Sequence, residues 1–359
     1  MRIVFVISSM DSGGAERVAS ILTDHWVNMG HKVHLVTYSK EKSFYKINKK
    51  ISLAQLDLLK ESGNILSSLK NNIVRIIALR KYFISVKPDI IISFMTTTNM
   101  RTIISSRMLK IPTIVSERTI KRPPGMKKTK DIFRDCLYRF CDAVIVQTNI
   151  DKASYKYSEN IHVIPNPILS IKKTGASYLK KEKIILGVGR LNMYKGFHLL
   201  IDAFSLLKER NGYKLVIIGD GQERENLLKQ VKKYKLQKLV QILHRKKNVF
   251  EYFRKSDIFV LPSFYEGYPN VLMEAMYFGC ACISFDCEHG PSEIITHGKN
   301  GLLVEKNNVQ ELSRRLQYLI TSSQIKKTLQ KNALEIIEKN NIQKIMSMWD
   351  NLIRHVVSK

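Results

Sequence analysis

Two basic residues stand close together in the second half of the chain, directly after a run of apolar residues at 184–188. They are Arg190 and Lys195. An arginine offers a two-pronged donor and a lysine a point charge, so the two together suit a diphosphate group. Two solvated residues among 59 lysines and arginines are the simpler alternative. Their place at a strand end favours a binding site.

A pair of glutamates follows a second apolar run, at 258–261. Glu266 lies in the loop after this run, and Glu274 lies one to two turns into the next helix, which ends before Gly279. Two glutamates at this spacing often arise by chance. At one sheet edge with the basic pair, however, they could contact opposite ends of one ligand. The loop, whose amides could meet negative charge at a helix N-terminus, contains Gly267, Tyr268, Pro269 and Asn270.

Glycines mark two further turns between a strand and a helix. Gly13 and Gly14 follow the apolar run 3–7, where they would let the backbone approach a ligand at a helix N-terminus. A glycine needed only for the geometry of the turn is an equal alternative. We interpret Gly219-Asp-Gly221, after the run 215–218, mainly as a structural turn near the same sheet edge as Arg190.

These residues need strands and helices to position them, and the apolar pattern predicts both. Short β-type runs alternate with longer amphipathic segments, at 3–7, 33–38, 89–94, 113–115 and 143–147, then at 184–188, 215–218, 239–243, 258–261 and 281–285. Near-continuous apolar strands between helices indicate parallel sheets covered on both faces. Ligands of such sheets bind beyond the carboxyl ends of the strands. The fold class is therefore α/β, with two doubly wound, Rossmann-like domains facing across a cleft.

A polar, lysine-rich stretch at 170–183 interrupts the alternation and predicts a linker. We expect an N-terminal domain over residues 1–168 and a C-terminal domain over 169–340. A last helix, 341–359, would pack back on the N-terminal domain. A chain of 359 residues is also too long for one typical core.

The net charge is +28, and it is evenly spread, because the two parts divided at Asn166 carry 27 − 13 and 32 − 18, or +14 each. Such a surface attracts nucleic acid, anionic lipid or a phosphorylated substrate, or is only a solvated basic surface. Five cysteines without a paired CxxC or a nearby histidine cluster predict reduced thiols and no metal site. No apolar stretch reaches the roughly 18 residues of a membrane span, so we expect a cytoplasmic protein.

Several motifs occur together in one order along the chain. They are GGAER at 13–17, GR and KG within 189–196, GDG at 219–221, the two glutamates, DCEHGPSEII at 286–295 and GLLV at 301–304. In this order they resemble the retaining glycosyltransferases of family 4, which have the GT-B fold. The resemblance covers nearly the whole chain and is strongest over 184–304. The motifs GGAER and GPSEII are especially similar to those of bacterial enzymes that extend lipid-linked oligosaccharides.

The resemblance implies a role for each motif residue. Arg190 and Lys195 would bind the diphosphate of a nucleotide sugar, with UDP as the expected nucleotide, and stabilise the leaving group. Glu274 would hold the ribose, Glu266 would contact the transferred sugar, and Gly14 with Gly13 would close over the diphosphate. Neither a metal nor another cofactor is implied. His244 stands where the family often has glycine, so contacts of the neighbouring Arg245 with the base are left open.

Candidates for binding the acceptor lie in the first half of the chain. Residues 65–87 predict an amphipathic helix with interleaved basic residues, which would either lie on anionic lipid or pack on the sheet with a solvated face. Glu117 and Arg118 follow a strand and could touch the acceptor. A basic loop that could bind a polyprenyl diphosphate contains Lys121, Arg122, Lys127 and Lys128.

We therefore expect a retaining enzyme that moves a hexose or N-acetylhexosamine to a lipid-linked saccharide, at the inner face of the plasma membrane, in the synthesis of a bacterial surface polysaccharide such as O-antigen or capsule. Two other classes stay open. Another nucleotide-sugar enzyme of the same fold, such as an epimerase, would turn over the donor without an acceptor. A nucleic-acid-binding protein would fit the charge, but no recognised motif or basic tail supports it.

Overall fold

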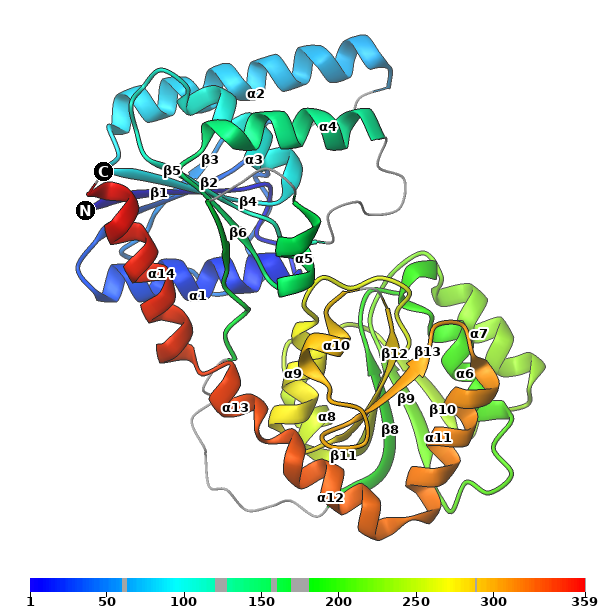
Figure 1. The fold of residues 1–359 in the computed structure, drawn as a ribbon. Helices are drawn as coiled ribbons and strands as arrows, with labels where there is room; N and C mark the ends of the chain where they lie inside the picture. Colours follow the sequence, from blue (N-terminus) through cyan, green and yellow to red (C-terminus); the bar gives the residue numbers. More distant parts are fainter. Residues whose placement is uncertain (60–62, 120–127, 156–159, 169–180, 288, 359) are drawn as a thin grey trace. The chain divides into compact units, whose positions relative to one another are not determined.

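The computed structural model describes residues 1–59, 63–119, 128–155, 160–168, 181–287 and 289–358. The chain divides into two compact units (Figure 1). The first is Met1–Pro167 together with Gln343–Lys359, and the second is Ile168–Ile342. Each unit has one parallel sheet with helices on both of its faces.

The sheet of the first unit has seven strands in the order β3-β2-β1-β4-β5-β6-β7. The strands are β1 (Arg2–Ile7), β2 (Lys32–Thr37), β3 (Ser52–Gln55), β4 (Ile90–Phe94), β5 (Thr113–Ser116), β6 (Ala143–Val146) and β7 (Ile161–Val163). β1 pairs in parallel with both β2 and β4. The order of the strands reverses there, which makes the carboxyl ends of β1 and β4 the switch point of this sheet.

The two faces of this sheet are covered by different helices. These are α1 (Gly14–Asn28), α2 (Ile65–Val86), α3 (Thr96–Ser106), α4 (Lys128–Leu137), the short α5 (Asn149–Ser154) and the C-terminal α14 (Ile342–Val357). Val4 and Val6 pack with Phe83 of α2 on one face. The alternate residue, Phe5, contacts Trp26 of α1 on the other, where Trp26 also meets Trp349 of α14. Successive residues of a strand point to opposite faces, and both faces are covered, which explains why β1 is apolar from Ile3 to Ile7.

The sheet of the second unit has six strands in the order β10-β9-β8-β11-β12-β13. The strands are β8 (Glu182–Val188), β9 (Lys214–Ile218), β10 (Val240–Leu243), β11 (Ser256–Leu261), β12 (Ala281–Asp286) and β13 (Leu302–Glu305). The first strand, β8, again lies in the middle, between β9 and β11. The switch point of this sheet is therefore at the carboxyl ends of β8 and β11.

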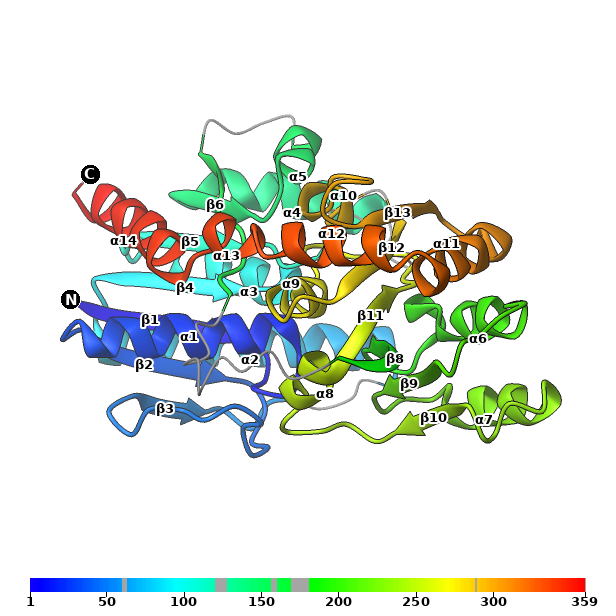
Figure 2. The same cartoon turned by 90° about the horizontal axis from the view of Figure 1, so that it is seen from below.

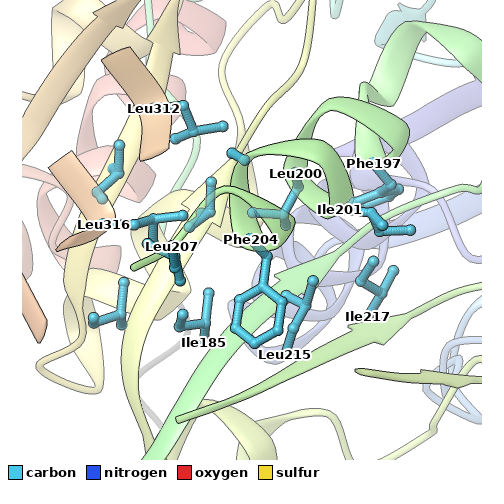
Figure 3. Packing of buried hydrophobic residues seen from close by; sticks show 14 of the residues in the cluster. Ile185, Phe197, Leu200, Ile201, Phe204, Leu207, Leu215, Ile217, Leu312 and Leu316 are labelled. Carbon is cyan, nitrogen blue, oxygen red and sulfur yellow. The ribbon is translucent and has the colours of Figure 1, made fainter. Parts of the chain in front are cut away.

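Helices cover both faces of the second sheet as well (Figures 1 and 2). They are α6 (Phe197–Ser205), α7 (Arg224–Lys233), α8 (Phe250–Lys255), α9 (Asn270–Tyr277), α10 (Pro291–Ile294), α11 (Val309–Thr321), α12 (Ser323–Ala333) and α13 (Ile336–Lys339). Figure 3 shows the core on the α6 face, where Leu200 and Phe204 belong to one buried cluster with the strand residue Leu215 and with Leu316 of α11. Burying one such side chain stabilises the fold by about 1.5–3 kcal/mol.

The ten predicted strands are all present, and both sheets are parallel. Three further strands, β3, β7 and β13, were not predicted; each has only three or four residues. The linker at 170–183 lies largely outside the described residues, but its last two residues belong to β8. All five cysteines are free, and all except Cys136 are buried. Among the described helices, none is both long and apolar enough to cross a membrane.

Candidate active site

The loops after β8 and β11 leave the second sheet side by side, because these strands are neighbours at the switch point. The loop after β8 begins with Gly189, whose amide donates to the carbonyl of Ile218 at 3.1 Å. It then forms one short 3₁₀ turn, Met193–Lys195, which is capped by Asn192 through a hydrogen bond from the amide of Lys195 (3.1 Å). This turn fixes the backbone of Lys195 at the edge of the sheet.

Gly196 lets the two loops touch. Its φ is +64°, and a Cβ at this position would lie 2.0 Å from the carbonyl oxygen of Pro262, the first residue after β11. Both the left-handed backbone and the contact between two main chains exclude a larger residue. The glycine of the KG motif therefore brings the β8 loop against the β11 loop.

Two further contacts join these loops, one through the main chain and one through side chains. The amide of Phe264 donates to the carbonyl of Tyr194 at 2.9 Å. The Lys195 ammonium then lies 2.6 Å from Oε1 of Glu266, and the side chains of the pair are 25% and 10% exposed. The structure thus brings two of the predicted catalytic residues into one ion pair at the switch point, a contact that the sequence did not predict.

Arg190 is exposed at the start of the same loop. Within the described part of the chain, its guanidinium has no hydrogen-bond or ion-pair partner, so its donors are available to a ligand. Lys195 is held by Glu266, and Arg190 is not. The two basic residues that the sequence predicted as a pair therefore differ in how strongly the protein fixes them.

The GDG turn after β9 packs on the β8 loop, as the sequence interpretation expects of a structural turn. A Cβ at Gly219 would lie 1.9 Å from the carbonyl oxygen of Gly189, and one at Gly221 would lie 2.2 Å from that of Leu191. The amide of Leu191 donates to the carbonyl of Asp220 at 2.9 Å. Both glycines are therefore required by close contacts of the main chain.

The side chain of Asp220 joins this turn to the loop after β10. Its carboxylate contacts Nδ1 of His244 at 2.6 Å and accepts a hydrogen bond from the amide of Arg245 at 3.1 Å. The hydrogen bond with His244 is the largest cause that lowers the pKa of Asp220. The pair fixes the start of the loop in which Arg245 is an exposed candidate for donor binding. The sequence did not reveal the contact between Asp220 and His244, because these residues are 24 positions apart.

The four residues of the predicted donor loop, 267–270, differ in burial and in their contacts. Gly267 makes a close contact, since a Cβ on Gly290, whose φ is +81°, would lie 2.2 Å from the carbonyl oxygen of Gly267. Tyr268 is 6% exposed, and its hydroxyl contacts the side chain of Asn340. Pro269 has no N–H and caps α9, and Asn270 is the first residue of the helix. Only three of the four residues therefore have a backbone N–H that could bind a ligand.

Glu274 lies one turn into α9 and is 7% exposed. The helix begins at Asn270 and ends at Tyr277, and Gly279 follows with a φ of +66°, as the sequence predicts for a helix end. In the first unit, Gly13 caps α1 and Gly14 is its first residue. The roles implied for Glu274, Gly13 and Gly14 stay predictions.

Glu117 and Arg118, the acceptor candidates, are 3% and 8% exposed in the first unit. The Glu117 carboxylate accepts hydrogen bonds from the hydroxyls of Tyr138 and Thr96, and burial raises its pKa. Arg118 donates to Oδ1 of Asn166 at 2.7 Å, and burial lowers its pKa to about 9. Both side chains are thus engaged inside this unit, and their contact with an acceptor stays a prediction.

The basic loop predicted before Lys130 is only partly within the described residues. Lys121, Arg122 and Lys127 lie outside them. Lys128 is the first residue of α4, so the prediction of a loop is wrong at this position. Among the described residues, no group of three or more His, Cys, Asp or Glu side chains could hold a metal ion.

Comparison with known proteins decides the family. The chain is 31% identical over 360 residues to a Campylobacter jejuni α-1,4-N-acetyl-D-galactosaminyltransferase, covering 99% of both chains. That enzyme is named for an acceptor in which a GalNAc-containing saccharide is linked to undecaprenyl diphosphate. The chain belongs to the family 4 glycosyltransferases. The model of Glycosyltransferase Family 4 matches residues 12–168, and that of glycosyl transferases group 1 matches residues 172–336.

Solved structures show the fold of this glycosyltransferase. Anabaena Alr3699/HepE in complex with UDP and glucose has a TM-score of 0.79 at 18% identity, over 99% of this chain and all of the other. Sucrose-phosphate synthase from Thermosynechococcus elongatus has a TM-score of 0.85 at 16% identity, over 99% of each chain. The two doubly wound sheets are those of the GT-B fold. In this glycosyltransferase, the Lys195–Glu266 ion pair lies at the switch point of the second sheet.

Proposed function

We propose that this glycosyltransferase moves a hexose or N-acetylhexosamine from a UDP-sugar to a saccharide linked to a polyprenyl diphosphate, with retention of the anomeric configuration. The observation that carries the proposal is the Lys195–Glu266 ion pair, together with the exposed Arg190 in the same loop as Lys195. The ion pair supplies a fixed charge for the leaving diphosphate and a carboxylate for the sugar. The relative from Campylobacter jejuni, named for a lipid-linked acceptor, supports the choice of acceptor.

In the proposed reaction, the bond between the anomeric carbon and the β-phosphate oxygen breaks. The acceptor hydroxyl attacks from the same face and gives its proton to the departing phosphate. Negative charge grows on the diphosphate as the bond breaks, so Arg190 and Lys195 stabilise the transition state more than the bound substrate. Glu266 holds Lys195 in place and accepts hydrogen bonds from the sugar, and no covalent intermediate on Glu266 is part of the proposal.

The same arrangement supports catalysis without a metal ion or another cofactor, because the two cationic side chains neutralise the diphosphate. Activity should therefore be unchanged by EDTA. A loss of activity in EDTA that Mg²⁺ or Mn²⁺ restores would contradict this part of the proposal.

The experiment that tests the function uses the full chain with a panel of UDP-sugars and a polyprenyl-diphosphate-linked N-acetylhexosamine. We expect release of UDP that depends on the acceptor, and a product whose anomeric proton shows retention by NMR. Arg190→Ala should abolish most of this release, and Arg314→Ala is the control, since Arg314 is an exposed arginine on α11. Donor turnover without any acceptor, giving a new sugar nucleotide, would instead support an epimerase.

We also propose that α2 brings the enzyme to the inner face of the plasma membrane. Five of its apolar side chains are 48–78% exposed, namely Leu66, Leu69, Ile73, Ile77 and Ile84. Such a set on one helix supports contact with a lipid surface. The basic residues contribute less than the sequence suggested, because Arg75 is buried and donates to the carbonyl of Leu58.

Flotation with phosphatidylglycerol vesicles tests this second proposal. Wild-type enzyme should float with the vesicles, more weakly at high salt because anionic lipid attracts the basic surface. Leu69→Glu should reduce flotation, and Leu228→Glu is the control, since Leu228 is an exposed leucine on α7 in the other unit. The absence of binding to these vesicles, or binding that Leu69→Glu leaves unchanged, would overturn the proposal.

A further inference from the structure

Two exposed tyrosines lie beside the Lys195–Glu266 ion pair. Tyr194 comes directly before Lys195, and Tyr265 comes directly before Glu266. Their ring centres are 6.0 Å apart, and the rings meet edge to face. Consecutive residues of the β8 loop thus meet consecutive residues of the β11 loop, first as an aromatic pair and then as an ion pair.

The aromatic pair is more exposed than the ion pair. Tyr194 is 52% exposed and Tyr265 is 37% exposed, whereas the Glu266 side chain is 10% exposed. The backbone hydrogen bond from Phe264 to Tyr194 holds together the two loop segments that carry the rings. Two tyrosines held together in contact with water, rather than packed into the core, are an aromatic surface that a ligand can cover.

A third residue adds a charge to this surface. The ammonium of Lys306, in the turn after β13, lies 5.1 Å from the centre of the Tyr265 ring. This cation–π contact restrains the ring, and it leaves the ammonium near the surface as a hydrogen-bond donor. The combination of aromatic rings and one donor suits a pyranose, whose C–H groups lie against a ring while its hydroxyls meet polar groups.

We infer that Tyr194, Tyr265 and Lys306 form a subsite for a pyranose ring of the acceptor saccharide. The inference rests on the proposed function. The donor sugar is assigned to the more buried Lys195–Glu266 pair, so a second sugar that must approach the same bond is placed on the more exposed residues next to it. The site is a positioning site and takes no part in breaking the bond to phosphate.

Kinetics of the full chain with a short-chain polyprenyl-diphosphate-linked N-acetylhexosamine test the subsite. Tyr194→Ala and Tyr265→Ala should each raise the KM for this acceptor by about 3- to 10-fold, the usual effect of one aromatic contact. The KM for the UDP-sugar and the slow hydrolysis of the donor without acceptor should stay at wild-type values. Tyr265→Phe keeps the ring and should retain the wild-type KM for the acceptor.

Tyr318→Ala is the matched control, because Tyr318 is 39% exposed on α11, and it should change neither KM. Unchanged acceptor KM in both tyrosine variants would overturn the subsite while wild-type transfer left the proposed function intact. A raised KM for the UDP-sugar would also overturn it, by assigning the rings to the donor. A wild-type chain that neither transfers nor hydrolyses any UDP-sugar would instead refute the proposed function.

Discussion

Replacing Lys195 by alanine removes one charge that should serve two purposes. The ammonium lies 2.6 Å from Oε1 of Glu266, so the change leaves this carboxylate without the partner that holds it. It also removes the fixed charge that would stabilise the departing diphosphate. The first effect should appear as a loss of stability, and the second as a loss of turnover.

The distance sets the size of the first effect. Two unit charges 2.6 Å apart attract by about 6 kcal/mol at an effective dielectric constant of about 20. Most of this attraction is offset by desolvation and lost side-chain freedom. Because the Lys195 side chain is 25% exposed, we expect a loss of about 1–3 kcal/mol in the free energy of unfolding, between the usual values for exposed and buried pairs.

The second effect, the loss of the charge that stabilises the leaving diphosphate, should lower kcat more than it raises the KM for the donor. Removing one preorganised donor to a developing oxyanion typically lowers kcat by about 100- to 1,000-fold. We expect Lys195→Ala to lower kcat by this amount and to change the KM for the donor by only a few-fold, because the lost interaction is strongest in the transition state.

Urea unfolding and acceptor-dependent UDP release measure the two effects separately. The double variant Lys195→Ala/Glu266→Gln removes the unpaired charge and should regain stability without regaining turnover. Lys326→Ala is the control, since Lys326 pairs with Asp257 at 2.7 Å with 12% and 11% exposure, away from the loops after β8 and β11. It should lose stability and keep its kcat per folded molecule. A kcat within about threefold of wild type in Lys195→Ala would refute the reasoning.

Two further predictions concern backbone and burial. Gly196→Ala should lower both the Tm and kcat, because its Cβ would meet Pro262 and its backbone is left-handed. Gly298→Ala has a similar φ, +76°, and nothing within 4 Å, so it should show only the strain of about 1–2 kcal/mol in urea unfolding. Burial raises the pKa of Glu117, so the folded state binds its proton more tightly and loses stability as pH rises above about 4.3. Relative to wild type, Glu117→Gln should become more stable in urea unfolding as pH rises from about 4.3 toward the raised pKa of Glu117, by at most about 1.4 kcal/mol per pH unit, and the difference should level off above that pKa. A constant difference between pH 4.5 and 7.5 would contradict this.

The sequence predicted the fold because long apolar strands alternate with amphipathic helices. β1 has six residues, five of them fully buried, and this apolar pattern is typical of a strand inside a parallel sheet. β3 escaped prediction because it lies at the sheet edge with three of its four residues exposed and the fourth only partly buried, which leaves little apolar signal. β7 has only three residues.

The candidate residues could be proposed from the sequence, but the contacts between their side chains could not. Strand ends identified Arg190, Lys195 and Glu266, since the carboxyl edge of a parallel sheet is where ligands bind. The ion pair joins residues 71 positions apart and the Asp220–His244 pair joins residues 24 positions apart, so neither leaves a local pattern. Side-chain pairing across loops depends on how closely the loops approach, and spacing along one chain does not encode this distance.

The glycines explain how these loops approach. At Gly196, Gly219, Gly221 and Gly290, a Cβ would fall 1.9–2.2 Å from a carbonyl oxygen of another loop. At each of these four glycines two main chains therefore come into contact, and none of the four needs a ligand to account for it. These contacts also position the charged residues next to the glycines. Lys195 directly precedes Gly196, and Glu266 lies four residues after Pro262, so the contact of Gly196 with Pro262 brings Lys195 close to Glu266. Substituting a glycine should consequently disturb catalysis through geometry, whereas substituting Lys195 should disturb it through charge.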